Sequence, residues 1–447
     1  MQITAVFDIG KTNKKFILFD EHFQPIHQEQ ITVSEIKDDD GYPCDDLATM
    51  EEWVIDTFKK AMSNPTYQIT RLNFSTYGAT IVNLDEVGKP ATSLYNYLKP
   101  YPPELQQQFM NQNGGEAVFC METASPALGM LNSGLQLYWL KHNKSQVFAQ
   151  IHRTLHLPQY FAFLFTGRLN GEFTTVGCHT GLWDFKRNTY HNWVQKEGIT
   201  PLLPEVRSAS TSCKINWNGY PLEVGIGIND TSANLVPYMM QQDASFLLLS
   251  TGTWSIALYP FSKDPLTPEE LQQDCLYFIR HDGRPVKVAR LFLGNEYQLQ
   301  VSDMTNFFSK PEDYHKQIRF DYKIYSEWRN TSFRNFKWES LNLSGIKSQS
   351  DAKTDFSVFH SFEEAYHQLM IALTDIQIQR IRLALGTGKI RKLFVDGGFV
   401  NNEVFLELLK IQLADTEIIT SHQPIGSATG AAMVMNISKI KNTFQDS

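Results

Sequence analysis

The sequence predicts an α/β protein that folds into two domains with mixed sheets. Its 447 residues are too many for one ordinary hydrophobic core. Apolar segments with strand and helix periodicity alternate in both halves of the chain. A short pattern of strand, polar turn and strand occurs near the N-terminus and again in the second half. We expect the boundary near Gln241-Gln242-Asp243, which separates residues 1–241 from 242–447.

The repeated pattern predicts two β-hairpins with small polar tips. The first runs over residues 5–19 around the turn Asp8 to Lys15, and the second runs over 246–259 around Ser250 to Ser255. Aligning the glycines of the two turns suggests a duplicated domain. Chance similarity is the alternative, because hairpins with a glycine in the turn are common.

Other elements are assigned from periodicity and from capping residues. The segment 260–357 is polar and aromatic and shows no clear period. Strands are expected at 71–75, 81–84, 223–228, 392–395 and 417–420, and helices at 131–141, 147–154, 232–240, 363–385, 401–414 and 427–436.

Composition excludes several classes of protein. Hydrophobic residues make up 42% and charged residues 20%, which is typical of a globular chain. The net charge of −8 and the lack of a basic cluster argue against nucleic-acid binding. No apolar run is long enough for a membrane span, and the N-terminus lacks the pattern of a secretion signal. Five scattered cysteines without CxxC spacing favour reduced thiols in the cytoplasm. The sequence is compatible with a homodimer.

The first hairpin turn has residues suited to a phosphate and a metal ion. Asp8 stands at the strand end and could hold Mg²⁺ directly or through water. Backbone N–H groups and cations could surround a phosphate at the residues that follow, which are Lys11, Thr12, Asn13, Lys14 and Lys15. The turn is not a Walker A loop. The alternative is a solvated hairpin tip.

Three further turns are candidates for chemistry. Thr251, Gly252 and Thr253 could bind phosphate oxygens through hydroxyl and backbone groups, although hydroxyls are common in turns. Asp230, between Asn229 and Thr231, could deprotonate an attacking hydroxyl, and a simple helix cap is the alternative. Gly397-Gly398 lets the backbone approach a ring or a phosphate. The small residues at 426–432 favour close helix packing.

In this order, these turns resemble those of the FGGY carbohydrate kinases, nearest the branch that acts on L-rhamnulose and L-fuculose. The resemblance runs from Val6 to about Ala432. The segments that carry it are Phe7-Asp8-Ile9-Gly10, Pro158-Gln159-Tyr160-Phe161, Thr166-Gly167-Arg168-Leu169-Asn170, Asn229-Asp230-Thr231-Ser232-Ala233, Ser250 to Ser255 and Asp396-Gly397-Gly398.

The resemblance implies two ribonuclease-H-like domains of the actin/Hsp70/sugar kinase type with a central cleft. The first domain would bind mainly a small-molecule sugar and the second mainly ATP. Asp230 would be the catalytic base and Asp8 would lie near Mg²⁺. The phosphates would lie between Lys11–Lys15 and Thr251–Thr253, and the adenosine against Gly397-Gly398.

The sugar-binding positions depart from the family pattern. The family typically has Trp-Gly-Val-Asp where this chain has Tyr77-Gly78-Ala79-Thr80, so a carboxylate is replaced by a hydroxyl. A polar contact becomes Leu291, and the histidine usual before the catalytic aspartate is Asn229. Tyr77, Gly78, Thr80, Asn229 and Thr231 are still expected to contact the sugar. His179 and His191 are expected to be surface or internally satisfied histidines.

Two functions follow from these residues. The first is a kinase for a ketose such as L-rhamnulose or L-fuculose, with xylulose, glycerol or another polyol as the alternative acceptor. The second is a nucleotide-binding regulator that turns over no sugar, which the loss of the carboxylate at Thr80 and the apolar Leu291 favour.

Overall fold

The chain folds into two compact units. The computed structural model describes residues 2–241, 245–329, 336–346, 353–421 and 426–437. One unit comprises Met1–Gln241, Tyr277–Pro285 and Ile425–Ser447, and the other comprises Gln242–Leu276 and Val286–Pro424. Of the residues expected at the domain boundary, Gln242 and Asp243 lie outside the described ranges.

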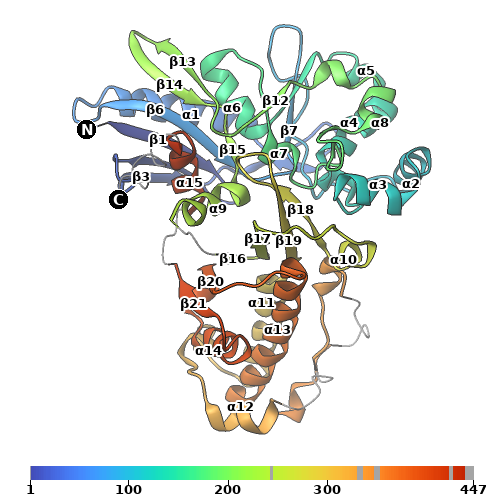
Figure 1. The fold of residues 1–447 in the computed structure, drawn as a ribbon, viewed down its shortest axis with the longest axis vertical. Coiled ribbons are helices and arrows are strands. Elements are labelled where there is room, and N and C mark those ends of the chain that lie inside the picture. The colour runs from blue at the N-terminus through green and yellow to red at the C-terminus, as the bar shows by residue number, and fades with distance from the viewer. Residues whose placement is uncertain (1, 242–244, 330–335, 347–352, 422–425, 438–447) are drawn as a thin grey trace. The chain divides into compact units, whose positions relative to one another are not determined.

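A mixed sheet forms the centre of the first unit (Figure 1). Its strand order is β13-β14-β6-β1-β2-β3, and β15 also pairs with β6. Strand β1 runs antiparallel to β2 and parallel to β6. The strands are β1 (Ile3–Ile9), β2 (Lys14–Phe19), β3 (Pro25–Ile31), β6 (Ile69–Thr76), β13 (Ser212–Trp217), β14 (Tyr220–Gly225) and β15 (Ile228–Asn229).

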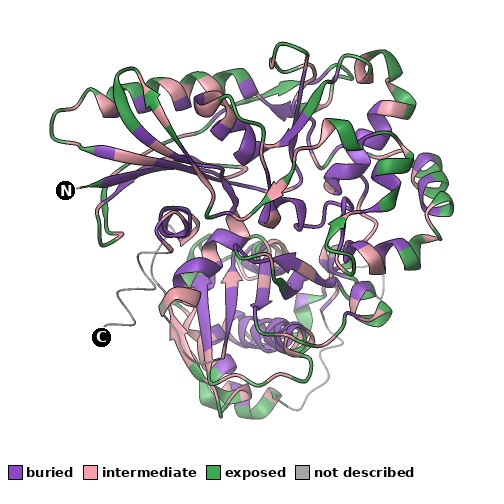
Figure 2. Ribbon diagram, turned by 45° about the horizontal axis from the view of Figure 1, so that its top comes forward, coloured by how far each residue is buried: buried purple, intermediate pink, exposed green. Residues whose placement is uncertain are grey.

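Two helical layers cover opposite faces of this sheet, and strand β1 is buried along its whole length (Figure 2). Ala5, Phe7 and Ile9 pack into the core that includes α1 (Leu47–Met62) and α6 (Leu157–Thr166). Val6 points to the other face, into the core formed with α9 (Asp230–Gln241) and α15 (Gly426–Val434). This alternation follows from the two-residue period of a strand.

The rest of the first unit lies mainly between β6 and β13 in the chain and supplies one wall of the site described below. Its elements are β4 (Glu35–Lys37), β5 (Pro43–Asp45), β7 (Ile81–Leu84), α2 (Pro103–Gln112), α3 (Glu116–Thr123), η1 (Gly129–Leu131), α4 (Ser133–Asn143), α5 (Ser145–Phe148), β8 (Arg153–His156), β9 (Gly171–Glu172), α7 (Phe173–Val176), β10 (Trp183–Asp184), β11 (Thr189–Tyr190), α8 (Asn192–Lys196), η2 (Thr200–Leu202) and β12 (Val206–Arg207).

The second unit is built on a sheet with the strand order β18-β19-β17-β16-β20-β21. Strand β16 is antiparallel to β17 and parallel to β20, as β1 is to β2 and β6. The strands are β16 (Phe246–Thr251), β17 (Ser255–Tyr259), β18 (Cys275–Ile279), β19 (Pro285–Leu291), β20 (Lys392–Gly397) and β21 (Glu417–Thr420). Both predicted hairpins are therefore present, and each begins the central part of its sheet.

The helices of the second unit surround a long buried helix, α13. It is capped at Ser361, whose side chain accepts a hydrogen bond from Glu364 N, and most of its residues are buried. The helices are α10 (Pro268–Gln272), α11 (Leu293–Phe307), η3 (Tyr314–Gln317), α12 (Tyr322–Trp328), η4 (Leu341–Ser344), η5 (Phe356–Val358), α13 (Phe362–Leu385), η6 (Gly398–Asn401) and α14 (Glu403–Gln412).

Two expectations differ from the structure. The helix expected at 147–154 is wrong, because α5 ends at Phe148 and residues 153–156 form strand β8, which pairs antiparallel with β7. Pairing with a distant strand outweighs the local helix preference here. The range 242–447 also differs from the observed units, because Ile425–Ser447 belongs to the first unit.

The C-terminal helix α15 joins the first unit because its residues are small. A Cβ atom on Gly430 would lie only 1.8 Å from the Ala233 carbonyl oxygen in α9. Only glycine allows the two helices to approach so closely.

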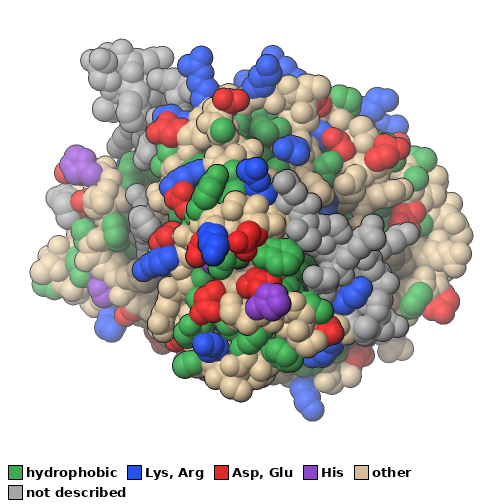
Figure 3. All heavy atoms as spheres, turned by 90° about the horizontal axis from the view of Figure 1, so that it is seen from below, with side chains coloured by type: hydrophobic (Ala, Val, Ile, Leu, Met, Phe, Trp, Pro, Cys, Tyr) green, Lys and Arg blue, Asp and Glu red, His purple; other side chains and the backbone are tan. Residues whose placement is uncertain are grey.

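Three general features of the described residues bear on function. No helix among them is both long enough and apolar enough to cross a membrane. On the face drawn in Figure 3, basic and acidic side chains are interspersed. All five cysteines are buried, and they form no disulfide.

The helix contact leads to a prediction about stability. In Gly430→Ala, the added methyl group must displace backbone in α9, and we expect a loss of about 1–3 kcal/mol or more. Thermal unfolding measures this loss. Gly398→Ala is the control, because a Cβ atom there meets nothing within 4 Å. Equal midpoints for the two variants would contradict the close packing.

Candidate active site

Two carboxylates of the first unit come together near the ends of β1 and β15. Asp8 is 9% exposed and accepts a hydrogen bond from Ser427 Oγ at 2.9 Å. Burial raises the pKa of Asp8, and the Ser427 hydrogen bond and the charge of Lys15 oppose that rise. Asp230 is half-buried at the start of α9. Burial, and then the negative charge of Asp8, raise the pKa of Asp230 to about 7.

The neighbour of Asp230 does much of the helix capping. Asn229 Oδ1 accepts hydrogen bonds from Thr231 N at 3.1 Å and from Ser232 N at 3.3 Å. These are the orphan N–H groups that an N-cap residue satisfies. Asp230 Oδ1 also accepts from Thr231 N, at 2.6 Å, and the Asn229 amide further opposes the rise in its pKa. Asp230 is therefore not needed as the N-cap, so the carboxylate is available for other chemistry.

Two of the three lysines in the first turn are tied to carboxylates of the first unit. Lys11 Nζ lies 2.7 Å from Asp45 Oδ2 and 3.3 Å from Glu35 Oε1. Lys14 is fully buried, and its Nζ donates to the Lys11 carbonyl oxygen at 2.8 Å and lies 3.7 Å from Asp45 Oδ1. Thr12 and Asn13 are exposed at the tip, where Gly10 N donates to Asn13 O. Lys15 is half-buried, and its charge acts on Asp8.

Two predicted sugar contacts use their hydroxyl groups internally. Tyr77 Oη donates to Asp45 Oδ2 at 2.6 Å, and Thr80 Oγ1 donates to the Gly78 carbonyl oxygen at 3.2 Å. Both side chains are buried. Gly78 itself adjoins Asn229, whose Nδ2 would lie 3.2 Å from a Cβ atom on the glycine. The structure thus brings Gly78, Asn229 and Asp230 together and leaves the Tyr77 and Thr80 hydroxyls in the wall.

In the second unit, the predicted phosphate turn and the paired glycines lie side by side. Thr251 Oγ1 donates to Asp396 O at 2.5 Å and accepts from Phe399 N at 3.1 Å, so its hydroxyl joins the two segments. Gly397 has φ +91°, and a Cβ atom there would lie 1.8 Å from the Thr251 carbonyl oxygen. Glycine is required here both by conformation and by space.

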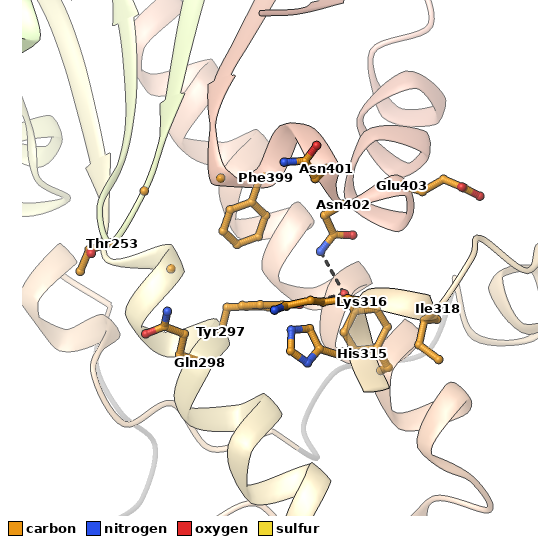
Figure 4. A pocket seen from close by; sticks show the side chains of 14 residues that line it. Thr253, Tyr297, Gln298, His315, Lys316, Ile318, Phe399, Asn401, Asn402 and Glu403 are labelled. Atoms are coloured by element: carbon orange, nitrogen blue, oxygen red, sulfur yellow. Dashed lines mark hydrogen bonds between the residues drawn. The ribbon is translucent and has the colours of Figure 1, made fainter. Parts of the chain in front are cut away.

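A pocket of about 560 Å³ begins at these turns (Figure 4). The rings of Tyr297 and Phe399 meet edge to face with centroids 5.2 Å apart. Tyr366 Oη hydrogen-bonds to Tyr297 Oη and accepts from Asn402 Nδ2, both at 3.0 Å. The lining residues are Gly252, Thr253, Gly294, Tyr297, Gln298, His315, Lys316, Ile318, Tyr366, Gly398, Phe399, Asn401, Asn402 and Glu403.

Sequence reasoning missed several of these residues. Asp45, Tyr297 and His315 carry no motif, and Ser427 was included only in a segment suited to helix packing. His191 is internally satisfied as expected, since its ring Nε2 lies 2.9 Å from Glu122. Leu291 is fully buried in β19 and serves the core.

The fold is that of the two-domain sugar kinases. A carbohydrate kinase from Novosphingobium aromaticivorans superposes with a TM-score of 0.76 at 21% identity, over 99% of this chain and 97% of the other. A xylulose kinase from Lactobacillus acidophilus superposes with a TM-score of 0.80 at 14% identity, over 99% and 92%. At these identities the likeness shows the fold alone.

The family follows from the sequence comparison. Residues 3–228 match the N-terminal domain of the FGGY family of carbohydrate kinases, and the chain belongs to this family. A rhamnulokinase from Halalkalibacterium halodurans is 26% identical over 262 residues, which is 56% of this chain and 52% of the relative. One from Oceanobacillus iheyensis is 24% identical, over 57% and 55%. The chain thus spans about half the length of the curated relatives it matches.

The raised pKa of Asp230 predicts how stability changes with pH. The unfolded carboxyl releases its proton near pH 3.8 and the folded one near pH 7. Between these values a rise in pH favours the unfolded state, and above pH 7 the cost levels off at no more than about 4 kcal/mol. Asp230→Asn removes that cost, so we expect it to be more stable than wild type at pH 8 and equally stable near pH 4.

Thermal unfolding between pH 4 and pH 8 measures this difference. Asp56→Asn is the control, because the Asp56 side chain is 64% exposed and its replacement removes no buried charge. A gap between Asp230→Asn and wild type that does not change with pH would contradict the raised pKa.

Proposed function

We propose that this chain transfers the γ-phosphoryl group of ATP to a hydroxyl of a sugar, preferably a ketose, with Asp230 as the general base. The observation that carries the proposal is the state of Asp230. It starts a helix that Asn229 caps, it is half-buried, and its pKa is raised to about 7. A base whose pKa lies near the working pH can take a proton and release it again.

The residues around Asp230 suit Mg²⁺. The carboxylate oxygens of Asp8 and Asp230 and the hydroxyl of Ser427 are hard oxygen donors, which this cation prefers. The two carboxylates lie close enough for Asp8 to raise the pKa of Asp230, and a cation would relieve that repulsion. Asp8 is the residue we expect to hold Mg²⁺. When bound, the ion would neutralise charge on the transferring phosphoryl group.

We assign the nucleotide to the second unit. Thr253 N and Gly398 N are the backbone donors that we propose for the phosphates, since Gly252 N donates to Trp254 O and Gly397 N donates to Asp396 Oδ1. The aromatic pocket beyond these turns offers Tyr297 and Phe399 to the base and ribose. The second unit would thus bind mainly ATP, and the first unit mainly the sugar. In the first turn, we propose backbone N–H groups as the phosphate ligands, because Lys11 and Lys14 are already engaged. Lys15 adds positive charge beside Asp8.

The acceptor is proposed as a ketose such as L-rhamnulose or L-fuculose. The matched relatives named rhamnulokinase support this choice. Similar structures include xylulose, gluconate and glycerol kinases, so another polyol is the alternative. A regulator without sugar turnover is the second candidate function, favoured by the internal bonding of Tyr77 and Thr80. We place the activity in the cytoplasm, where thiols stay reduced.

The test is ADP release with a panel of ketoses, aldoses and polyols. We expect at least one ketose to stimulate release. Nucleotide binding with no stimulation by any sugar would favour the regulator and overturn the kinase.

Replacing the base separates chemistry from binding. We expect Asp230→Asn to lower kcat by a factor of roughly 10² to 10⁴, because an amide cannot accept the proton. ADP affinity, measured by calorimetry, should stay within about threefold, because the base is proposed to act on a hydroxyl of the acceptor sugar and not on ADP. Asp56→Asn is the matched control. Near-normal turnover in Asp230→Asn would exclude Asp230 as the base.

The aromatic pocket gives an independent prediction. Tyr297→Ala removes a ring that contacts Phe399 and should weaken ADP binding roughly 3–10-fold, the range expected for one aromatic contact. Tyr322→Ala is the control, since Tyr322 is 65% exposed and lies outside the pocket. Unchanged ADP affinity in Tyr297→Ala would place the nucleoside elsewhere.

A further inference from the structure

The first unit contains a fully buried glutamate that the proposed roles leave unexplained. Glu172 ends β9 and directly precedes α7, and it is 0% exposed. Burial raises the pKa of Glu172 to about 7, and hydrogen bonds from Thr174 and Thr175 oppose this rise. Capping of α7 does not require such a group, because serine or threonine would satisfy the same N–H groups without a buried carboxylate. The residue therefore points to a further role.

Three hydrogen bonds fix the Glu172 carboxylate against the start of α7. Its Oε1 accepts from Thr174 N at 2.8 Å. Its Oε2 accepts from Thr175 N at 3.0 Å and from Thr174 Oγ1 at 2.6 Å. An ionised carboxylate can only accept, so the proton of the Thr174 hydroxyl points to Glu172. The lone pairs of that hydroxyl are then directed away from Glu172.

The Thr174 hydroxyl receives a donor from β15, which lies next to α7 (Figure 1). Asn229 N donates to Thr174 Oγ1 at 2.9 Å, and both residues are buried. Because the hydroxyl proton is directed to Glu172, the hydroxyl oxygen is an acceptor at this contact. Glu172 and Thr174 thus hold the backbone of the residue that directly precedes Asp230.

A second chain of hydrogen bonds ties the start of α7 to the segment before β15. Thr175 Oγ1 donates to Gln159 Oε1 at 3.0 Å, and Gln159 Nε2 donates to Ile226 O at 3.1 Å. Gln159 is 1% exposed, so water does not compete for these bonds. The backbone that leads into Asp230 is therefore held at two points by groups at the start of α7.

The position of a general base decides how well it works. The base must lie within hydrogen-bond reach of the proton it takes, and a displacement of about 1 Å can lower the rate roughly 10²-fold. We infer that Glu172 and Thr174 are positioning residues, which hold the backbone at Asn229 so that Asp230 meets the acceptor hydroxyl. Both act through Asn229 rather than on the substrate. This inference rests on the proposed role of Asp230 and deepens it.

Thr174→Val tests the inference with a small change. Valine has the shape of threonine but lacks the hydroxyl, so Asn229 N loses its acceptor and Glu172 loses a donor. We expect kcat for the preferred sugar of the panel to fall roughly 10–100-fold and KM to stay within about threefold, because proton transfer depends on position more steeply than binding does. An unchanged kcat would overturn the inference.

Two variants control for the loss of a buried hydroxyl. Thr174→Ser keeps the hydroxyl and should restore kcat to within about threefold of wild type. Thr180→Val is the matched control, because Thr180 is 1% exposed and its hydroxyl also donates and accepts, to Val176 O and from Leu182 N. It should keep the wild-type kcat well below its unfolding temperature. An equal loss of kcat in Thr174→Val and Thr180→Val would mean a merely structural role and would contradict the inference.

A double-mutant cycle tests whether Glu172 acts through Thr174. Glu172→Gln keeps the shape of the side chain but replaces one accepting oxygen by an amide group, so kcat should fall as in Thr174→Val. We expect the double variant to lie within about twofold of the worse single variant, because both changes break one chain of hydrogen bonds. Losses that multiply would show independent action and overturn the role of Glu172. The Thr174 variants decide the inference where Glu172→Gln does not fold.

Hydrogen–deuterium exchange separates this inference from the proposed function, because it requires no turnover. We expect Thr174→Val to speed amide exchange at residues 228–232 about tenfold, with β1 and β6 unchanged and with Thr174→Ser close to wild type. Faster exchange across the whole first unit would mean a merely structural role and would overturn the inference. If wild type turns over no sugar of the panel, the kinase proposal fails. Faster exchange confined to residues 228–232 would then still support the positioning of Asp230, and unchanged exchange would overturn it.

Discussion

The close packing of α15 against α9 is the constraint on which the candidate site of the first unit depends. Gly430 allows this contact, because any β-carbon there would meet the Ala233 carbonyl oxygen. This packing places α15, which lies late in the chain, against α9, which begins at Asp230. It also places Ser427 where its hydroxyl donates to Asp8. The two carboxylates of the site are therefore held by one pair of helices, and a change in the helix contact would reach both.

Burial of these two carboxylates costs the first unit electrostatic free energy. Asp8 and Asp230 are removed from water and act on one another, and the pKa of each is raised. Elsewhere in the unit, opposite charges lie next to one another, as in the cluster of Lys11, Lys14 and Asp45. Like charges kept close at one place, with paired charges around them, are typical of a functional site. Because Lys11 and Lys14 lie beside Asp45, the number of lysines in this turn does not by itself predict how many of them bind phosphate.

The candidate site of the second unit is built from different chemical groups. Its turns depend on glycine and on backbone groups, and its pocket is lined by aromatic rings and amides. Gly397 and Thr251 illustrate this, because the missing β-carbon of one lets the backbone of the other approach. Such a surface suits a flat ring and a chain of phosphates, whereas the first unit offers carboxylates and hydrogen-bonding side chains suited to a polyol. The two similar hairpins therefore begin sheets whose sites differ in chemistry.

The sequence by itself determined the α/β class, both hairpins, and the placement of Asp8 at a strand end and Asp230 at a helix start. Each of these depends on residues adjacent in the chain, whose periodicity and capping are visible locally. Only the tertiary structure decided that Lys11 pairs with Asp45, that Ser427 reaches Asp8 across 419 positions, and that His179 stands beside Gly78. The physical reason is that a side chain's partners are set by distance in space, and no local pattern records which distant segment will pack against it.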